Sequence, residues 1–106
     1  MSPNEDIVKT EQLVLRAICL APAHAAVRET GFRLLKDYRW HEPVHEAIFQ
    51  SLSRLSAHDP ESIRRLLPSY LTRYGYPDVD FAALMVPHGL SENDARRLMK
   101  ELKLRD

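Results

Sequence analysis

The chain has 106 residues, enough for one compact domain with a modest core. Its 15 Lys and Arg side chains balance 15 Asp and Glu side chains, so no global field attracts nucleic acid or an anionic membrane surface. No apolar run approaches the roughly 20 residues needed to span a bilayer. The single cysteine, Cys19, cannot form an internal disulfide, so we expect a cytoplasmic setting with Cys19 as a small buried hydrophobe.

Apolar side chains recur at helical spacing from the start of the chain. Four of them on one face predict a first helix: Leu13, Val14, Ala17 and Ile18. That helix should begin near residues 6–10 and end before Pro22. A second helix is expected over about 23–36. Gly31 lies inside it and is either a break or a point of close packing, because glycine costs about 1 kcal/mol relative to alanine within a helix.

Proline residues mark the start of the next two helices. The third helix should begin at Pro43, since proline lacks an N–H and suits the first turn, and end near residues 57–58. Its apolar stripe consists of Val44, Ile48, Leu52 and Leu55, flanked by Phe49. The fourth helix should have Asp59 as N-cap, followed by Pro60, and end at Gly75. Pro68 lies inside it and predicts a kink or a split.

Two more helices complete the pattern. A short one is expected over about 78–86, and a last one from a cap at residues 91–94 to about Lys103. The inner face of the last helix consists of Ala95, Leu98, Met99 and Leu102. We find no convincing β-strand, repeat or linker. The sequence therefore predicts an all-α fold, a single domain over residues 1–106 folded as a globular bundle of about five to seven short helices.

Residues 41–45 spell H-E-x-x-H, the pattern in which two histidines on one helix face bind zinc and the glutamate acts as a base. Here Pro43 separates the histidines. We therefore expect His41 outside the helix, His45 inside it, and their side chains to diverge. No other histidine has the spacing of a known third-ligand motif. We interpret the match as incidental, with Glu42 as an ordinary loop residue, and expect neither a metal nor a cofactor.

Other signs of enzyme chemistry are also missing from the sequence. None of the three glycines lies in a phosphate-binding loop pattern, and no serine has G-x-S-x-G around it. A single cysteine cannot form a C-x-x-C metal motif. We therefore do not expect an enzyme.

The last helix carries a basic group, Arg96, Arg97 and Lys100, that could contact phosphates. Acidic residues interleave with these cations, and the helix dipole favours cations near a C-terminus in any case. No aromatic residue lies among them to stack on bases. A solvated helix face is the favoured interpretation, and a small helical DNA-binding domain is the alternative.

The order of three segments resembles one family. These segments are Glu11-Gln12-x-Val14-Leu15, then Leu34-Leu35, then Trp40-x-x-Pro43-x-His45-x-x-Ile48-Phe49-x-x-Leu52-x-x-Leu55. The order is similar to the helical N-terminal domain of bacterial replicative DnaB-type helicases and to the related C-terminal helicase-interaction domain of bacterial primases. The resemblance covers roughly residues 11–74. It implies a non-catalytic module that binds other proteins, with His45 as a core-helix residue.

The resemblance implies a replicative helicase or a primase as the partner, and a role as a replication accessory or regulator. Candidate contact residues are Tyr74, Tyr76, Met99 and Leu102, because aromatic residues and methionine are enriched at interfaces. Core packing is the alternative for these residues and is favoured for Leu102, whereas Tyr76 lies in a Gly-Tyr-Pro turn. A homodimer is a further hypothesis, because small helical domains often self-associate when an apolar stripe stays uncovered.

Overall fold

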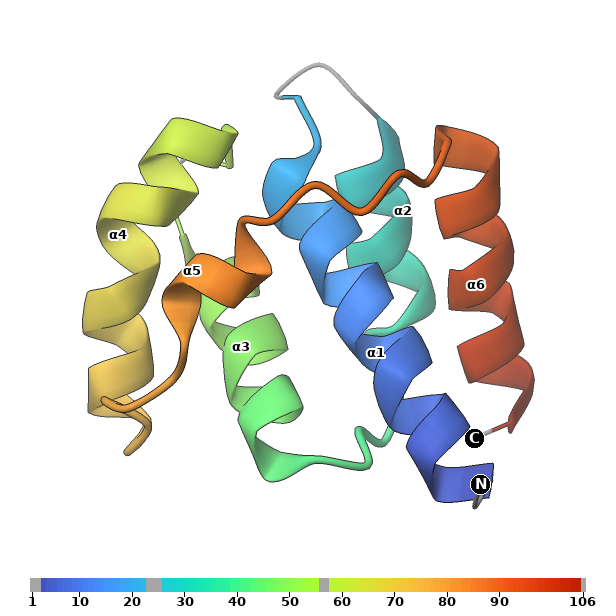
Figure 1. Cartoon of the computed structure of the whole chain (residues 1–106), viewed down its shortest axis with the longest axis horizontal. Coiled ribbons are helices and arrows are strands. Elements are labelled where there is room, and N and C mark those ends of the chain that lie inside the picture. The colour runs from blue at the N-terminus through green and yellow to red at the C-terminus, as the bar shows by residue number, and fades with distance from the viewer. Residues whose placement is uncertain (1–2, 23–25, 56–57, 106) are drawn as a thin grey trace.

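The computed structural model describes residues 3–22, 26–55 and 58–105. Within these ranges the chain forms six helices and no strand, which confirms the predicted all-α bundle (Figure 1). The helices are α1 (Pro3–Leu20), α2 (Ala26–Leu34), α3 (Pro43–Arg54), α4 (Pro60–Arg73), α5 (Phe81–Leu84) and α6 (Glu92–Arg105). Over the described residues, no helix combines the length and the apolar character that crossing a membrane requires.

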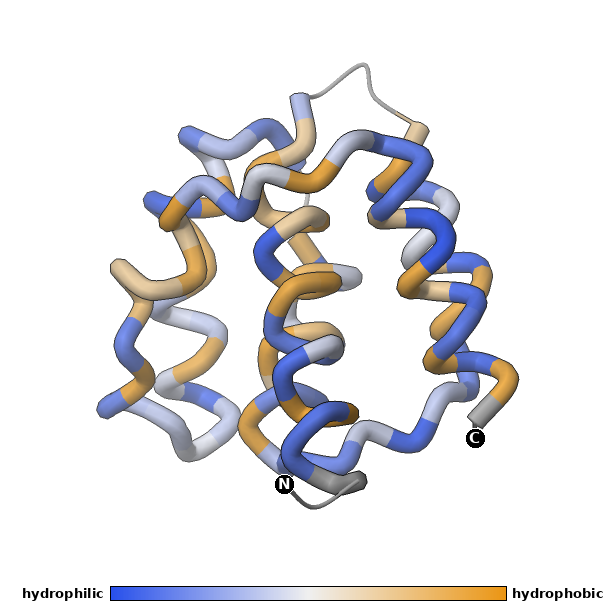
Figure 2. Tube along the Cα trace, turned by 45° about the vertical axis from the view of Figure 1, so that its right-hand side comes forward, coloured by the Kyte–Doolittle hydropathy of each residue, from blue (hydrophilic) through white to orange (hydrophobic). Residues whose placement is uncertain are grey.

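Helix α1 lies at the centre of the bundle and contacts each of the other five helices. Helices α3 and α4 pack together on one side of it, and α2 and α6 pack together on the other (Figure 1). Four apolar α1 side chains are fully buried: Val14, Leu15, Ile18 and Cys19. Figure 2 shows α6, at the edge of the bundle, as mainly hydrophilic with hydrophobic residues at intervals. This is the pattern of a helix that buries one stripe and solvates the rest.

Gly31 does not break α2, which continues through it to Leu34. A Cβ atom at this position would lie 3.0 Å from Ile18 Cδ1 and 3.1 Å from Met99 Cε. Those two side chains belong to α1 and α6, so the missing side chain lets three helices approach one another. The close-packing interpretation of Gly31 is therefore confirmed.

We expect Gly31→Leu to lower the free energy of unfolding by about 2–3 kcal/mol, because extra methylenes in a packed core force side chains and backbone apart. Urea denaturation followed by circular dichroism measures this. Glu29→Leu, at an exposed position of the same helix, is the matched control and should stay within about 0.5 kcal/mol of the wild type. Equal stability of the two variants would show that the contact at Gly31 is not tight.

The ends of α4 follow the predicted local chemistry. The Asp59 carboxylate accepts a hydrogen bond from the Ser62 backbone N–H at 3.0 Å, so Asp59 is the N-cap. At the other end Gly75 has a φ of +92°. The Gly75 N–H donates to Thr72 O, and the next N–H, of Tyr76, donates to Leu71 O. This pair of bonds is the Schellman arrangement, in which a residue with positive φ ends a helix.

Pro68 lies inside α4 without dividing it, so the predicted split is wrong. Pro68 and Arg64, the residue one turn before it, are both exposed. The Arg64 carbonyl, which loses its helical donor at Pro68, is therefore on the solvent side, where water can satisfy it.

Several predicted boundaries shift by a few residues. Helix α1 begins at Pro3, before the expected range of 6–10, and α5 is shorter than the expected 78–86. Helix α3 ends at Arg54, although its predicted end at 57–58 falls partly outside the described residues. The predicted start of the second helix at residue 23 also lies outside them.

Candidate functional site

A fully buried carboxylate, that of Glu11 on α1, joins the α2–α3 connection to the first turn of α3. Glu11 is 0% exposed. Its Oε2 accepts hydrogen bonds from the Tyr38 hydroxyl at 2.6 Å and from the His41 backbone N–H at 2.9 Å. Its Oε1 lies 2.8 Å from His45 Nδ1. We call Glu11, Tyr38, His41 and His45 the Glu11 network.

The protons of the Glu11 network follow from its geometry. An ionised carboxylate only accepts, so His45 Nδ1 carries a proton and donates it to Glu11. The single hydroxyl proton of Tyr38 is directed to Glu11 at 2.6 Å. His41 Nδ1, which is 3.1 Å from Glu11 Oε2 and 3.2 Å from the Tyr38 oxygen, must therefore also be a donor.

The same bonds keep Glu11 charged. Burial raises the pKa of the Glu11 carboxyl, but the hydrogen bonds that it accepts from His45, Tyr38 and His41 outweigh burial and lower the pKa to about 2. Glu11 is thus an ionised group in the interior that accepts four hydrogen bonds. Such a network is stabilising only while all of its members are present.

The two histidines of the H-E-x-x-H pattern lie where the backbone argument placed them, His41 in the loop and His45 on α3. The predicted divergence of their side chains is wrong, because both Nδ1 atoms reach the carboxylate of Glu11. The acceptor comes from a helix 34 residues before His45, so spacing within residues 41–45 did not indicate it. In the described ranges, no group of three or more His, Cys, Asp or Glu side chains is placed to hold a metal ion.

A hollow of about 390 Å³, which we call the His45 pocket, opens beside this network between α1, α3 and α5. It is lined by Gln12, Arg16, Val44, His45, Ile48, Val79, Asp80, Ala83 and Leu84. Arg16 holds the segment after α5 across α1, since its guanidinium donates to Val86 O at 2.9 Å and to Pro87 O at 2.7 Å. Figure 1 shows this segment crossing in front of α1.

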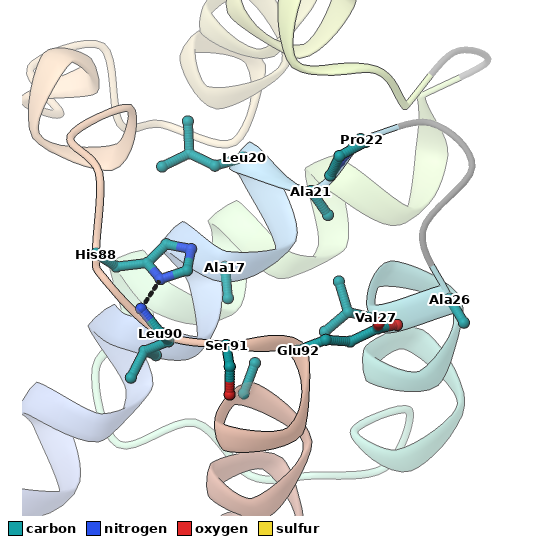
Figure 3. Close-up of a pocket in the computed structure, with 11 residues that line it drawn as sticks. Ala17, Leu20, Ala21, Pro22, Ala26, Val27, His88, Leu90, Ser91 and Glu92 are labelled. Atoms are coloured by element: carbon teal, nitrogen blue, oxygen red, sulfur yellow. Dashed lines mark hydrogen bonds between the residues drawn. The ribbon is translucent and has the colours of Figure 1, made fainter.

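A second hollow, of about 650 Å³, lies on the other side of that crossing segment. We call it the α1/α2/α6 groove. Figure 3 shows its lining, which consists of Ala17, Leu20, Ala21, Pro22, Ala26, Val27, His88, Leu90, Ser91, Glu92 and Ala95. Burial and the positive charge of Arg16 lower the pKa of His88, which favours its neutral form. His88 Nδ1 accepts a hydrogen bond from the Leu90 N–H at 2.9 Å. Most of the other lining residues are apolar, and Ser91 and Glu92 are the polar ones.

The four predicted contact residues do not form one surface. Met99 and Leu102 are 0% and 1% exposed, so they belong to the core, and the hypothesis that their side of α6 is a contact surface is wrong. The reason is that this side of α6 packs against α1 and α2. Tyr74 and Tyr76 are half-buried at the end of α4, across the bundle from α6 (Figure 1). The Arg54 guanidinium lies over the Tyr74 ring, 5.7 Å from its centre.

The three basic residues of α6 lie on its surface, but acidic neighbours offset two of them. Arg96 Nη2 is 3.2 Å from Glu92 Oε1, and Arg97 Nη2 is 3.4 Å from Asp94 Oδ1. Lys100 is exposed. Pairing of this kind is weak in water, but it reduces the local positive field that phosphates would sense.

Comparison of the chain with protein-family models, with curated proteins and with solved structures finds no match.

The burial of two charged residues, Glu11 and Arg28, was not predicted from the sequence. Glu11 falls on the same helical face as Val14, Leu15 and Ile18, and an acidic residue on an apolar stripe is a signal of a buried partner. Arg28, 4% exposed on α2, donates to the Ile18 and Ala21 carbonyls at the end of α1. No comparable local pattern marks Arg28.

Proposed function

We propose that this chain is a non-catalytic protein-interaction module of the type that its sequence pattern resembles, an accessory or regulator that binds a replicative helicase or a primase. The observation that carries the proposal is that residues from separate segments of the pattern are buried together in the protein core. Glu11 from the first segment and His45 from the third are hydrogen-bonded to each other, 34 residues apart. Glu11 and His45 are the residues of the pattern best suited to acid–base chemistry, and their hydrogen bond stabilises the fold instead.

The apolar residues of the pattern support the same proposal. Those that are buried are Val14, Leu15, Leu35, Ile48, Phe49, Leu52 and Leu55. Trp40 packs with its ring centre 5.2 Å from that of Phe49. A pattern made of interior positions is expected of a framework, which leaves recognition of a partner to the surface.

We assign partner binding to the α1/α2/α6 groove. Alanine side chains form much of its wall, so an approaching backbone meets little obstruction: these are Ala17, Ala21, Ala26 and Ala95. An apolar groove between helices accepts the apolar face of an amphipathic helix, a recurrent mode of protein recognition. The expected occupant is such a helix from the helicase or the primase.

The test is a titration of the purified protein against the replicative helicase and the primase of its own host, with the mass of the complex read by light scattering. A defined complex with either protein is expected. No complex at concentrations of tens of micromolar would refute the replication role. Light scattering of the protein alone would report self-association.

A matched pair of variants locates the contact. Ala26→Arg places a long charged side chain in the groove, and Ala82→Arg places one on α5 outside it. Both alanines are exposed in the first turn of a helix, so both variants should fold. We expect Ala26→Arg to weaken the complex at least about tenfold, a loss of about 1.4 kcal/mol, and Ala82→Arg to leave it unchanged. Equal affinities of the two variants would move the contact away from the groove.

A further inference from the structure

The connection between α5 and α6 crosses α1 with little of its own surface in the core (Figure 1). Over residues 75–94, Leu84 is the one buried residue, and Val86 is 49% exposed. We call residues 85–91 the strap. A segment with so few buried contacts opens at a small cost in free energy, so the polar contacts along the strap decide whether it stays in place.

Two sets of hydrogen bonds fix the strap. The Arg16 guanidinium on α1 donates to the Val86 and Pro87 carbonyls, at 2.9 and 2.7 Å. Directly after them, the His88 Nδ1 atom accepts from the Leu90 N–H at 2.9 Å and closes a turn (Figure 3). Both residues of this turn line the α1/α2/α6 groove, so the strap forms one wall of that groove.

The hydrogen bond within the turn requires a neutral His88. A backbone N–H can only donate, so Nδ1 must present its lone pair to Leu90, and the ring proton lies on Nε2. A histidinium carries a proton on each nitrogen and cannot accept this bond. Protonation of His88 therefore costs the strap one hydrogen bond and places a second cation near Arg16.

The surroundings of His88 favour the neutral form while the strap is in place. Burial and the positive charge of Arg16 on α1 lower its pKa. On α6, Glu92 is the one acidic residue of the groove lining, and its Oε1 is already 3.2 Å from Arg96 Nη2. The residues that α2 contributes to the lining are uncharged, and neither α5 nor the rest of the strap has a titratable side chain.

We propose that the strap is a pH-sensitive switch, fixed across α1 at neutral pH and released when His88 is protonated, so that one wall of the α1/α2/α6 groove opens. The release begins as the pH falls below 6.5, the ordinary pKa of histidine, because the open strap then takes up a proton that the closed strap does not. The switch is a property of the chain itself and does not depend on a helicase or primase partner.

The test is the proton–nitrogen nuclear Overhauser effect of the strap amides of Val86, Gly89 and Leu90 in the whole protein, between about pH 7.5 and about pH 5. This effect falls when a backbone amide becomes mobile on the picosecond to nanosecond timescale. We expect it to fall with the same midpoint as the titration of the His88 ring. An unchanged effect while the ring titrates would overturn the proposal.

His88→Asn separates the hydrogen bond from the charge. An asparagine side-chain oxygen accepts readily from the N–H two residues later, as in Asx-turns, but it does not titrate in this range. The strap of this variant should therefore stay ordered from about pH 7.5 to about pH 5. A loss of order with the same midpoint as in the wild type would assign the change to another group and overturn the proposal.

Arg16→Met supplies the reference for a released strap. Methionine keeps much of the aliphatic length of this half-buried side chain but donates no hydrogen bond, so circular dichroism should show an intact helical fold. We expect the strap amides of this variant to be mobile already at neutral pH, and those of the wild type to approach the same values as the pH falls. A strap as ordered as that of the wild type at neutral pH would also overturn the proposal.

Discussion

Replacing Glu11 by glutamine is expected to lower the free energy of unfolding by about 3 kcal/mol or more. The carboxylate, which is itself 0% exposed, accepts hydrogen bonds from Tyr38, His41 and His45. Glutamine keeps the shape but replaces one acceptor oxygen by an NH₂ group, which would face a donor. At least one buried donor then loses its partner, and loss of one member of a buried charged network costs about 3–5 kcal/mol.

Urea denaturation followed by circular dichroism measures this loss, and a thermal scan should show a fall in melting temperature of roughly 10–20 °C. Glu46→Gln is the matched control, because Glu46 is an exposed carboxylate on α3 close in sequence to His45. The control should stay within about 0.5 kcal/mol of the wild type. A Glu11→Gln variant as stable as this control would mean that the network does not stabilise the fold.

The same carboxylate should make the protein sensitive to acid. Its pKa is about 2 in the folded state and 4.5 in its ordinary state, so folding favours the ionised form. Its stabilising contribution is complete above pH 4.5 and is lost as the pH falls toward 2, because in this range the unfolded chain takes up a proton that the folded protein does not. The contribution is about 3 kcal/mol, because one unit of pKa shift corresponds to about 1.4 kcal/mol.

This prediction is tested by the free energy of unfolding at a series of pH values between 5 and about 2. The wild type should lose stability steeply over this window, and Glu11→Gln should give a flatter profile. Asp59, whose pKa is lowered by the hydrogen bonds that its carboxylate accepts from Ser62, contributes equally to both proteins. Parallel profiles would show that Glu11 is not the acid-sensitive group.

The features that could be predicted from the sequence are those that depend on neighbours along the chain. A cap needs only the residue before a helix and an N–H in its first turn, so Asp59 followed by Pro60 sufficed to place the start of α4. Positive φ is accessible to glycine without strain, so Gly75 placed its end. Apolar spacing located the buried faces, because the period of a helix is constant.

Sequence by itself thus determined an all-helical chain, the start of α3 at Pro43 and the burial of residues such as Ile18 and Ile48. The tertiary structure alone decided that His41 and His45 converge on Glu11, that Gly31 is a three-helix contact, and where the two hollows lie. These features depend on the angles and distances at which separate helices pack. Periodicity along one helix shows which face is buried, but not which residue of another helix it meets.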